Sequence, residues 1–240
     1  MVFKVTTNGT LTDLYSFGGT NDGFNLSAGL VQGSDGYFYG TTVQGGTNNL
    51  GTVFKINTNG ALSSLYSFTG TNDGKNPTAG LVQGSDGCFY GTTSSGGTNN
   101  YGTVFKINTN GALTSLYSFT GGNDGGTPYY AGLVQGSDGS FYGTTLYGGV
   151  QNGTSGFGVV FRLTVLPPQL AITPSGANVI LSWPTNYAGF ITGFTLEFAT
   201  NLVSPTVWQT NSTSPIVISG QNVVTNPISD AQMFFRLSSP

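Results

Sequence analysis

The feature that most constrains this chain is a fifteen-residue word that occurs three times. It reads Ala-Gly-Leu-Val-Gln-Gly-Ser-Asp-Gly, one variable residue, then Phe-Tyr-Gly-Thr-Thr, at residues 28–42, 79–93 and 131–145. Asp tolerates turn conformations and Gly adopts positive φ without steric cost, so a chain readily reverses at Ser-Asp-Gly. Each copy therefore predicts a β-hairpin.

A second word gives the period. Val-Phe-Lys-Val begins at residue 2, Val-Phe-Lys-Ile at residues 53 and 104, and Val-Phe-Arg-Leu at residue 160, so the intervals are 53 − 2 = 51, 104 − 53 = 51 and 160 − 104 = 56. A period near 50 made only of strand-like words indicates a repeat array, and a β-propeller ahead of other repeat folds. Small insertions around residues 127–130 and 150–157 lengthen the last interval.

Each period predicts four strands, which is the content of a propeller blade. In the second copy they fall at residues 81–83, 88–92, 103–107 and 113–119, with no helical periodicity between them. The last two are joined at an Asn-Gly turn, a strong hairpin signal that recurs at residues 8–9, 59–60 and 110–111. The predicted fold class is an all-β, propeller-like array of four-stranded blades followed by a small β-sandwich.

The aromatic residues predict how the blades pack. Phe and Tyr are adjacent at residues 38–39, 89–90 and 141–142, so both faces of these strands are expected to be covered, as in blades that stack face to face. A glycine follows each pair, at Gly40, Gly91 and Gly143. Glycine inside a strand often marks the close approach of another backbone, although these glycines would also serve simply to end the strands.

The words themselves resemble a known family. Gly-Thr-Val-Phe-Lys-Ile-Asn-Thr-Asn-Gly, Leu-Tyr-Ser-Phe, Asn-Asp-Gly, Ala-Gly-Leu-Val-Gln-Gly-Ser-Asp-Gly and Phe-Tyr-Gly-Thr-Thr, in this order over residues 1 to about 163, resemble the GloVer (Gloeo/Verruco) tandem repeat. Ser-Asp-Gly-x-Phe-Tyr-Gly-Thr is also similar to the blades of two-component-regulator sensor propellers. The resemblance implies large secreted or cell-surface bacterial proteins with C-terminal anchors, and no established ligand or activity. We expect this chain to depart from that pattern, with a start in the middle of a repeat and an end, Arg-Leu-Ser-Ser-Pro, that does not resemble an anchor.

Closure of a ring is the difficulty for a propeller. The sequence supplies two full blades, three strands of a third and a leading half-blade, whereas closed propellers usually have about four to eight blades. The strand expected at residues 11–17 would complete the third blade as a closing strap. Otherwise the chain is part of a longer array, which we favour, or it forms an open arc that associates with itself through its edges.

Residues 166–240 carry no copy of the repeat, and we expect them to form a domain separate from residues 1–165. Leu166-Pro167-Pro168 predicts a stiff connector. Short strands are expected at residues 179–184, 194–198, 207–209, 215–218 and 233–237, a spacing typical of a β-sandwich. The order Leu-Ser-Trp-Pro, Phe-Thr-Leu-Glu, Trp, Phe-Phe-Arg-Leu resembles a small fibronectin-type-III-like domain in which one strand is missing.

Composition narrows the function classes. Charged residues make up 6 % of the chain, and the six basic residues are scattered, which argues against a nucleic-acid partner. No apolar run is long enough to cross a bilayer, so no membrane insertion is expected. No signal peptide is visible, and the expected secreted or cell-surface location rests on the family resemblance alone.

Catalytic chemistry has few candidate residues here. The absence of His removes the usual general base and the commonest metal ligand. Six of the nine acidic residues are repeat positions: Asp35, Asp86 and Asp138 in Ser-Asp-Gly, and Asp22, Asp73 and Asp124 in Asn-Asp-Gly. The first three are expected to form turns. The second three are ligand-site candidates, since with neighbouring Asn and Thr oxygens they would hold calcium; the alternative is an Asx turn without a ligand.

Cys88 and the basic residues of the second word are expected to have structural roles. The single Cys, Cys88, aligns with Tyr37 and Ser140 and is expected to be an ordinary strand position rather than a nucleophile. The basic residues of the second word are interpreted as solubilising groups at blade edges rather than as an anion site; they are Lys4, Lys55, Lys106 and Arg162.

Three tyrosines are the remaining ligand candidates. Tyr129 and Tyr130 lie in the first insertion and Tyr147 lies near the second, and aromatic faces beside Asn and Asp groups suit sugar rings; packing within the loop is the alternative. The sequence thus predicts a non-enzymatic, extracytoplasmic binding or structural module with no cofactor. Its expected partner is a glycan or another surface protein. The alternatives are a carbohydrate-binding module of a polysaccharide-acting system and a calcium-stabilised adhesive or lectin-like repeat.

Overall fold

The computed structural model describes residues 1–19, 21–130, 132–151, 154–165, 169–184, 195–203, 206–228 and 232–238. Its regular elements in these ranges are all β-strands, as predicted, and they form small antiparallel sheets. The chain divides into two compact units, unit 1 (Met1–Val165) and unit 2 (Leu166–Pro240), which are described separately below. The predicted connector at residues 166–168 lies outside the described ranges.

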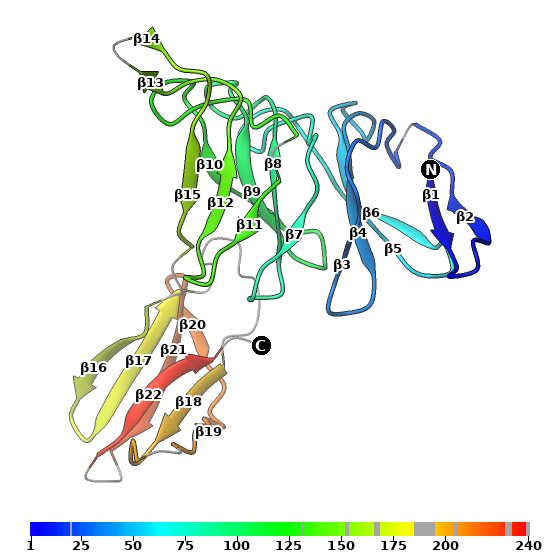
Figure 1. Cartoon of the computed structure of the whole chain (residues 1–240). Coiled ribbons are helices and arrows are strands. Elements are labelled where there is room, and N and C mark those ends of the chain that lie inside the picture. Colours follow the sequence, from blue (N-terminus) through cyan, green and yellow to red (C-terminus); the bar gives the residue numbers. More distant parts are fainter. Residues whose placement is uncertain are drawn as a thin grey trace. The chain divides into compact units, whose positions relative to one another are not determined.

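Unit 1 contains two complete four-stranded sheets, one for each full repeat (Figure 1). We call them blade 1 and blade 2. Blade 1 has the strand order β3 (Val31–Gln32), β4 (Phe38–Thr42), β5 (Thr52–Ile56), β6 (Leu62–Ser67). Blade 2 has the order β7 (Val82–Gln83), β8 (Phe89–Thr93), β9 (Thr103–Ile107), β10 (Leu113–Ser118). The four strands predicted per repeat are therefore confirmed.

Incomplete sheets precede and follow these blades. The half-blade pairs β1 (Val2–Val5) with β2 (Leu11–Tyr15), and blade 3 contains β11 (Val134–Gln135), β12 (Phe141–Thr144) and β15 (Val160–Leu163). The second insertion adds the pair β13 (Val150–Gln151) and β14 (Thr154–Ser155). The suggested strap is wrong, because β2 pairs with β1 and β15 pairs only with β12 among the described strands. The Asn-Gly hairpin between β1 and β2 makes that local pairing the easier one to close.

Turn chemistry explains why each repeat word becomes a hairpin. In the first copy, Gly36 has φ +83° and its amide donates to the carbonyl of Gly33, while the amide of Gly33 donates to the carbonyl of Tyr37. This left-handed position is open to glycine without steric penalty. The same two bonds recur in the second and third copies, so the predicted turn forms three times.

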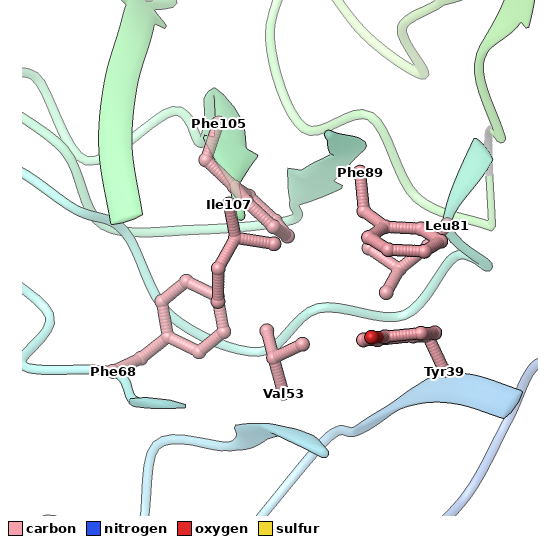
Figure 2. Close-up of a cluster of buried hydrophobic side chains, with 7 residues drawn as sticks. All are labelled: Tyr39, Val53, Phe68, Leu81, Phe89, Phe105 and Ile107. Carbon is pink, nitrogen blue, oxygen red and sulfur yellow. The ribbon is translucent and has the colours of Figure 1, made fainter. Parts of the chain in front are cut away.

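The blades stack face to face through aromatic side chains (Figure 2). Tyr39 of blade 1 stacks on Phe89 of blade 2 with ring centroids 3.9 Å apart, and Tyr90 stacks on Phe141 of blade 3 at the same distance. β8 and β9 are buried at every residue, so the prediction of two covered faces is confirmed for blade 2. In blade 3, β12 alternates buried and exposed residues, as a sheet at the end of a stack would.

The strand glycines make room for a phenylalanine ring of the same blade, and not for the backbone of another blade. A Cβ on Gly40 would lie 2.6 Å from Cζ of Phe54, its cross-strand partner in the same blade. Gly91 and Gly143 face Phe105 and Phe161 in the same way. The close backbone approach between blades occurs instead at the turns, where a Cβ on Gly60 would lie 2.4 Å from the carbonyl oxygen of Leu14.

Unit 2 is a two-sheet sandwich. One sheet has the order β16 (Ala171–Ser175), β17 (Asn178–Pro184), β21 (Gln221–Pro227), β20 (Ile216–Ile218); the other has β19 (Gln209–Thr210), β18 (Thr195–Ala199), β22 (Phe234–Ser238). Its core combines residues of both sheets: Leu181, Trp183, Leu196 and Val224. Trp183 is buried in this core. The strands β16 and β21 were not predicted.

Candidate binding surface

The Ser-Asp-Gly aspartates hold both a turn and a tyrosine. In blade 2, Oδ1 of Asp86 accepts the Cys88 amide at 3.1 Å and Oδ2 accepts the Tyr90 hydroxyl at 2.7 Å. Asp35 with Tyr39, and Asp138 with Tyr142, repeat this arrangement with hydroxyl bonds of 2.6 and 2.9 Å. The turn-forming role is confirmed, and the additional tyrosine bond is a feature that spacing alone did not indicate.

The expectation that the repeat lysines solubilise blade edges is wrong for blade 2. Lys106 is 1 % exposed, and its ammonium lies 2.9 Å from Oδ2 of Asp86. Burial lowers the pKa of Lys106, although the Asp86 carboxylate opposes this shift. In blade 1, Lys55 is half-buried; it donates to the Thr109 carbonyl of the next repeat at 3.1 Å. Lys4 and Arg162, in the incomplete sheets, are exposed.

Cys88 lies beside this ion pair and is 8 % exposed. Burial raises the pKa of its thiol to about 11, so the thiolate is scarce near neutral pH. This environment agrees with the prediction that Cys88 is a structural strand position.

The Asn-Asp-Gly aspartates close their loops by accepting several hydrogen bonds. Asp73, which is 8 % exposed, accepts the Thr69 amide at 2.7 Å, the Thr69 hydroxyl at 2.6 Å and the Tyr66 hydroxyl at 2.9 Å. Asp124 has the same partners in the next repeat, namely the amide and hydroxyl of Thr120 and the hydroxyl of Tyr117. Asp22 accepts the amides of Gly18 and Gly19 and the hydroxyl of Tyr15.

These hydrogen bonds shift the pKa values of the carboxyl groups that accept them. Partial burial alone would raise the pKa of Asp22 and of Asp124, but the donated hydrogen bonds hold both pKa values below the ordinary range. Burial, together with the Asp73 carboxylate, raises the pKa of Tyr66 to about 12. The loops of Asp22 and Asp124 therefore contain an ionised acceptor near neutral pH, which favours a hydrogen bond from a neutral phenol.

The calcium interpretation gains no separate support from this geometry. The three loop aspartates lie in three different repeats, and among the described residues no three acidic, Cys or His side chains gather where they could hold one metal ion. Their carboxylates already accept amides and hydroxyls, as Asx-type loop closures do. Calcium at these loops stays a prediction.

The first insertion presents two tyrosines on the surface. Tyr129 and Tyr130 are 46 % and 60 % exposed, and their rings meet edge to face with centroids 4.3 Å apart. Tyr130 has φ +55°, an unusual conformation for a bulky side chain, and its amide donates to the Thr78 hydroxyl of blade 2 at 3.1 Å. The loop is thus tied to the neighbouring blade while its aromatic rings remain accessible.

Tyr147 joins this region through its backbone. Its amide and carbonyl exchange hydrogen bonds with Gly126, at 3.1 and 2.9 Å, and the Thr127 amide donates to the Tyr101 carbonyl at 2.7 Å. Tyr147 is 57 % exposed. The structure therefore connects the segments that carry the three candidate tyrosines, whereas it places the three loop aspartates in separate repeats. The anchors Thr78 and Tyr101 were not predicted, because they belong to the preceding repeat.

Comparison with known families agrees with this repeat geometry. The family model described as the Gloeobacter/Verrucomicrobia repeat matches residues 1–190. The chain belongs to this repeat family. The match extends past the end of unit 1 into unit 2, and the resemblance drawn from the repeated words is confirmed. No curated protein matches the chain.

The described residues contain no helix long and apolar enough to cross a membrane.

Proposed function

We propose that this member of the Gloeobacter/Verrucomicrobia repeat family is a non-enzymatic, extracytoplasmic binding or structural module. The observation that carries the proposal is the use of the repeat aspartates. All six accept hydrogen bonds from a tyrosine hydroxyl and from backbone amides of their own loop. Carboxylates used in this way close the loops and turns of the repeat, whereas general acid–base catalysis needs groups directed at a substrate.

The architecture we propose is a propeller-like stack with an immunoglobulin-type sandwich after it. Four-stranded blades packed face to face support the first part. The sheet order β16-β17-β21-β20 supports the second, since it is the A-B-E-D order of such sandwiches, and β18 and β22 then correspond to strands C and F. The fibronectin-type-III resemblance belongs to this proposal.

We further propose that the tyrosine loop of blade 3 is the ligand surface and that its ligand is a glycan. Two exposed aromatic rings offer apolar faces to a sugar ring, and their hydroxyls offer hydrogen bonds. The left-handed Tyr130 supports a functional role, because such a residue costs about 1–3 kcal/mol and persists where its surroundings hold it.

A glycan array with the full chain tests this proposal. Tyr129→Ala and Tyr130→Ala are each expected to reduce the signal about tenfold or more, the loss that corresponds to about 1.4 kcal/mol. Tyr130→Phe, which keeps the ring, should retain most of it. Phe157→Ala is the matched control, since Phe157 is a more exposed aromatic residue in the neighbouring insertion.

Two outcomes would contradict the glycan proposal. One is equal loss in Phe157→Ala, which would mean non-specific adhesion to aromatic surface. The other is turnover of an arrayed glycan that Asp→Asn changes abolish, which would make the protein an enzyme. If the protein binds no glycan on the array, the glycan proposal is wrong, and the proposal of a structural module is unaffected.

A further inference from the structure

Among the described strands, none lies at the edge of blade 3 where the complete blades have their fourth strand. β5 pairs with β4 on one side and β6 on the other, and β9 likewise pairs with β8 and β10. β15 has the same sequence position in its repeat, but in the described part of the chain it pairs only with β12. An unpaired edge is a template for an added strand.

An apolar groove runs beside this edge. A cavity of about 360 Å³ lies between the last strand of blade 2 and β15. Its apolar lining includes Val104 and Phe119 on one side and Phe161 and Leu163 on the other. Polar groups also line it, from Tyr117, Asn123, Asp124 and Arg162. In the preceding repeat the residues equivalent to Phe161 and Leu163, Phe105 and Ile107, are fully buried, whereas Phe161 and Leu163 themselves are only half-buried.

The complete blade shows what fills this position. In blade 2 the fourth strand places Leu113 opposite Ile107, Ser115 opposite Phe105 and Tyr117 opposite Val104. Leu113 also packs against the apolar cluster between blades 1 and 2. By repeat equivalence, a strand with the same sequence would set its leucine opposite Leu163 and its central serine opposite Phe161.

We propose that this groove binds an extended segment with the sequence of the repeat's own fourth strand, Ala-Leu-x-Ser-Leu-Tyr-Ser-Phe, supplied by another repeat. The segment adds to β15 as an antiparallel strand, so its amides and carbonyls pair with the free edge while its leucine enters the groove. The segment carries no charge, so its binding requires no desolvation of an ionised group of its own.

The half-blade is the obvious internal source of such a strand, but it is already engaged. β2 pairs with β1, and Phe17 packs its ring 5.1 Å from that of Phe54. β2 therefore does not occupy the edge of β15, and a segment from another repeat binds there without displacing it.

The test uses the full chain and a labelled peptide of residues 112–119, Ala-Leu-Thr-Ser-Leu-Tyr-Ser-Phe, extended by two lysines for solubility. Fluorescence anisotropy is expected to show saturable one-to-one binding, and the peptide should raise the melting temperature of unit 1. The peptide carrying Ser115→Pro should bind at least about tenfold more weakly, because proline removes an amide from the new strand ladder. The peptide carrying Leu113→Ala should also bind more weakly, since it loses the side chain that fills the groove.

A matched pair of chain variants locates the site. Tyr117 lines the groove and Tyr142 does not; they are 40 % and 36 % exposed, and each donates its hydroxyl to a repeat aspartate. Tyr117→Ala should weaken peptide binding, and Tyr142→Ala should leave it unchanged. Three results would overturn the proposal: no saturation up to about 1 mM peptide, equal binding of the Ser115→Pro peptide, or loss of binding in Tyr142→Ala alone.

Discussion

The three tyrosine–aspartate pairs of the Ser-Asp-Gly turns allow one hydrogen bond to be measured at two levels of burial in a single chain. Tyr90 is 1 % exposed and donates to Asp86 at 2.7 Å, whereas Tyr142 is 36 % exposed and donates to Asp138 at 2.9 Å. The bonds have similar lengths, and the residues occupy equivalent positions. Tyr→Phe removes the hydroxyl and keeps the ring, so the two substitutions differ in little besides the surroundings.

The expected costs follow from those surroundings. A hydrogen bond to a charged group contributes about 1.5–3 kcal/mol when water does not compete for it, so Tyr90→Phe should lower the unfolding free energy by about that amount. At Tyr142, water replaces the lost partner, and the change should stay within about 0.5 kcal/mol. For a unit of this size, 1 kcal/mol shifts the melting temperature by about 2–4 °C, so Tyr90→Phe predicts a fall of about 3–12 °C.

The assay must report on unit 1. Both tryptophans of the chain, Trp183 and Trp208, belong to unit 2, so tryptophan fluorescence follows the other unit. Differential scanning calorimetry, combined with tyrosine near-ultraviolet circular dichroism, follows the blades. Equal destabilisation by Tyr90→Phe and Tyr142→Phe would refute the reasoning, because it would mean that burial in the stack does not set the strength of this bond.

Three further predictions concern the same stack. Gly91→Ala should cost about 1–3 kcal/mol in a urea titration, since the new methyl group would lie 2.7 Å from the ring of Phe105, whereas Gly29→Ala has open space and should be neutral or slightly stabilising. Lys106→Met should destabilise unit 1 by about 3–5 kcal/mol, the cost of removing one partner of a buried ion pair. The control Lys4→Met changes an exposed lysine and should alter the unfolding free energy little, and equal effects of the two substitutions would contradict burial of the pair. The stability of unit 1 should fall on acidification, because folding lowers the pKa values of the loop aspartates Asp22 and Asp124. Their contribution to the unfolding free energy is complete above the unfolded pKa of about 4 and is lost as pH falls through the folded pKa values. A urea midpoint that is unchanged between pH 6 and pH 3 would contradict this prediction.

Local chemistry was enough to predict the hairpins of unit 1. Each turn contains its own glycine at positive φ, as at Gly36 and Gly87, and each aspartate accepts an amide within its own loop. The residues that form each turn lie within a few positions of one another, so one copy of the repeat is enough to predict the turn. In unit 2, β17, β18, β20 and β22 were predicted from their apolar residues. β21 (Gln221–Pro227) was not, because it contains two asparagines, a glutamine and a threonine, and its pairing with β17 decides its structure.

The environment of a repeat position depends on its neighbours and could not be predicted from the same local words. Lys4, Lys55 and Lys106 occupy one position in three sheets, yet they are exposed, half-buried and buried. Of these three lysines, the described structure gives an ion pair to Lys106 alone, with Asp86; its blade lies between blade 1 and blade 3. For the candidate site, the sequence indicated which tyrosines lie in the insertion, but the contact from Thr78 that fixes Tyr130 comes from the preceding repeat.

This dependence on neighbours identifies where the stability of unit 1 resides. Tyr39, Tyr90 and Tyr142 stand in the same word, and their exposed fractions are 0 %, 1 % and 36 %. The first two stack on a phenylalanine of the following blade, at 3.9 Å in both cases. No described residue takes that place on Tyr142, so identical chemistry yields a core residue inside the stack and a surface residue at its end. In a repeat protein of this kind the nearest-neighbour interface, rather than the single sheet, is the unit that stabilises the fold. It follows that the same apolar substitution should cost more in blades 1 and 2, which pack against a further sheet on both faces, than in blade 3. It also follows that the free positions of blade 3 are those at which another strand of the repeat would gain most by binding.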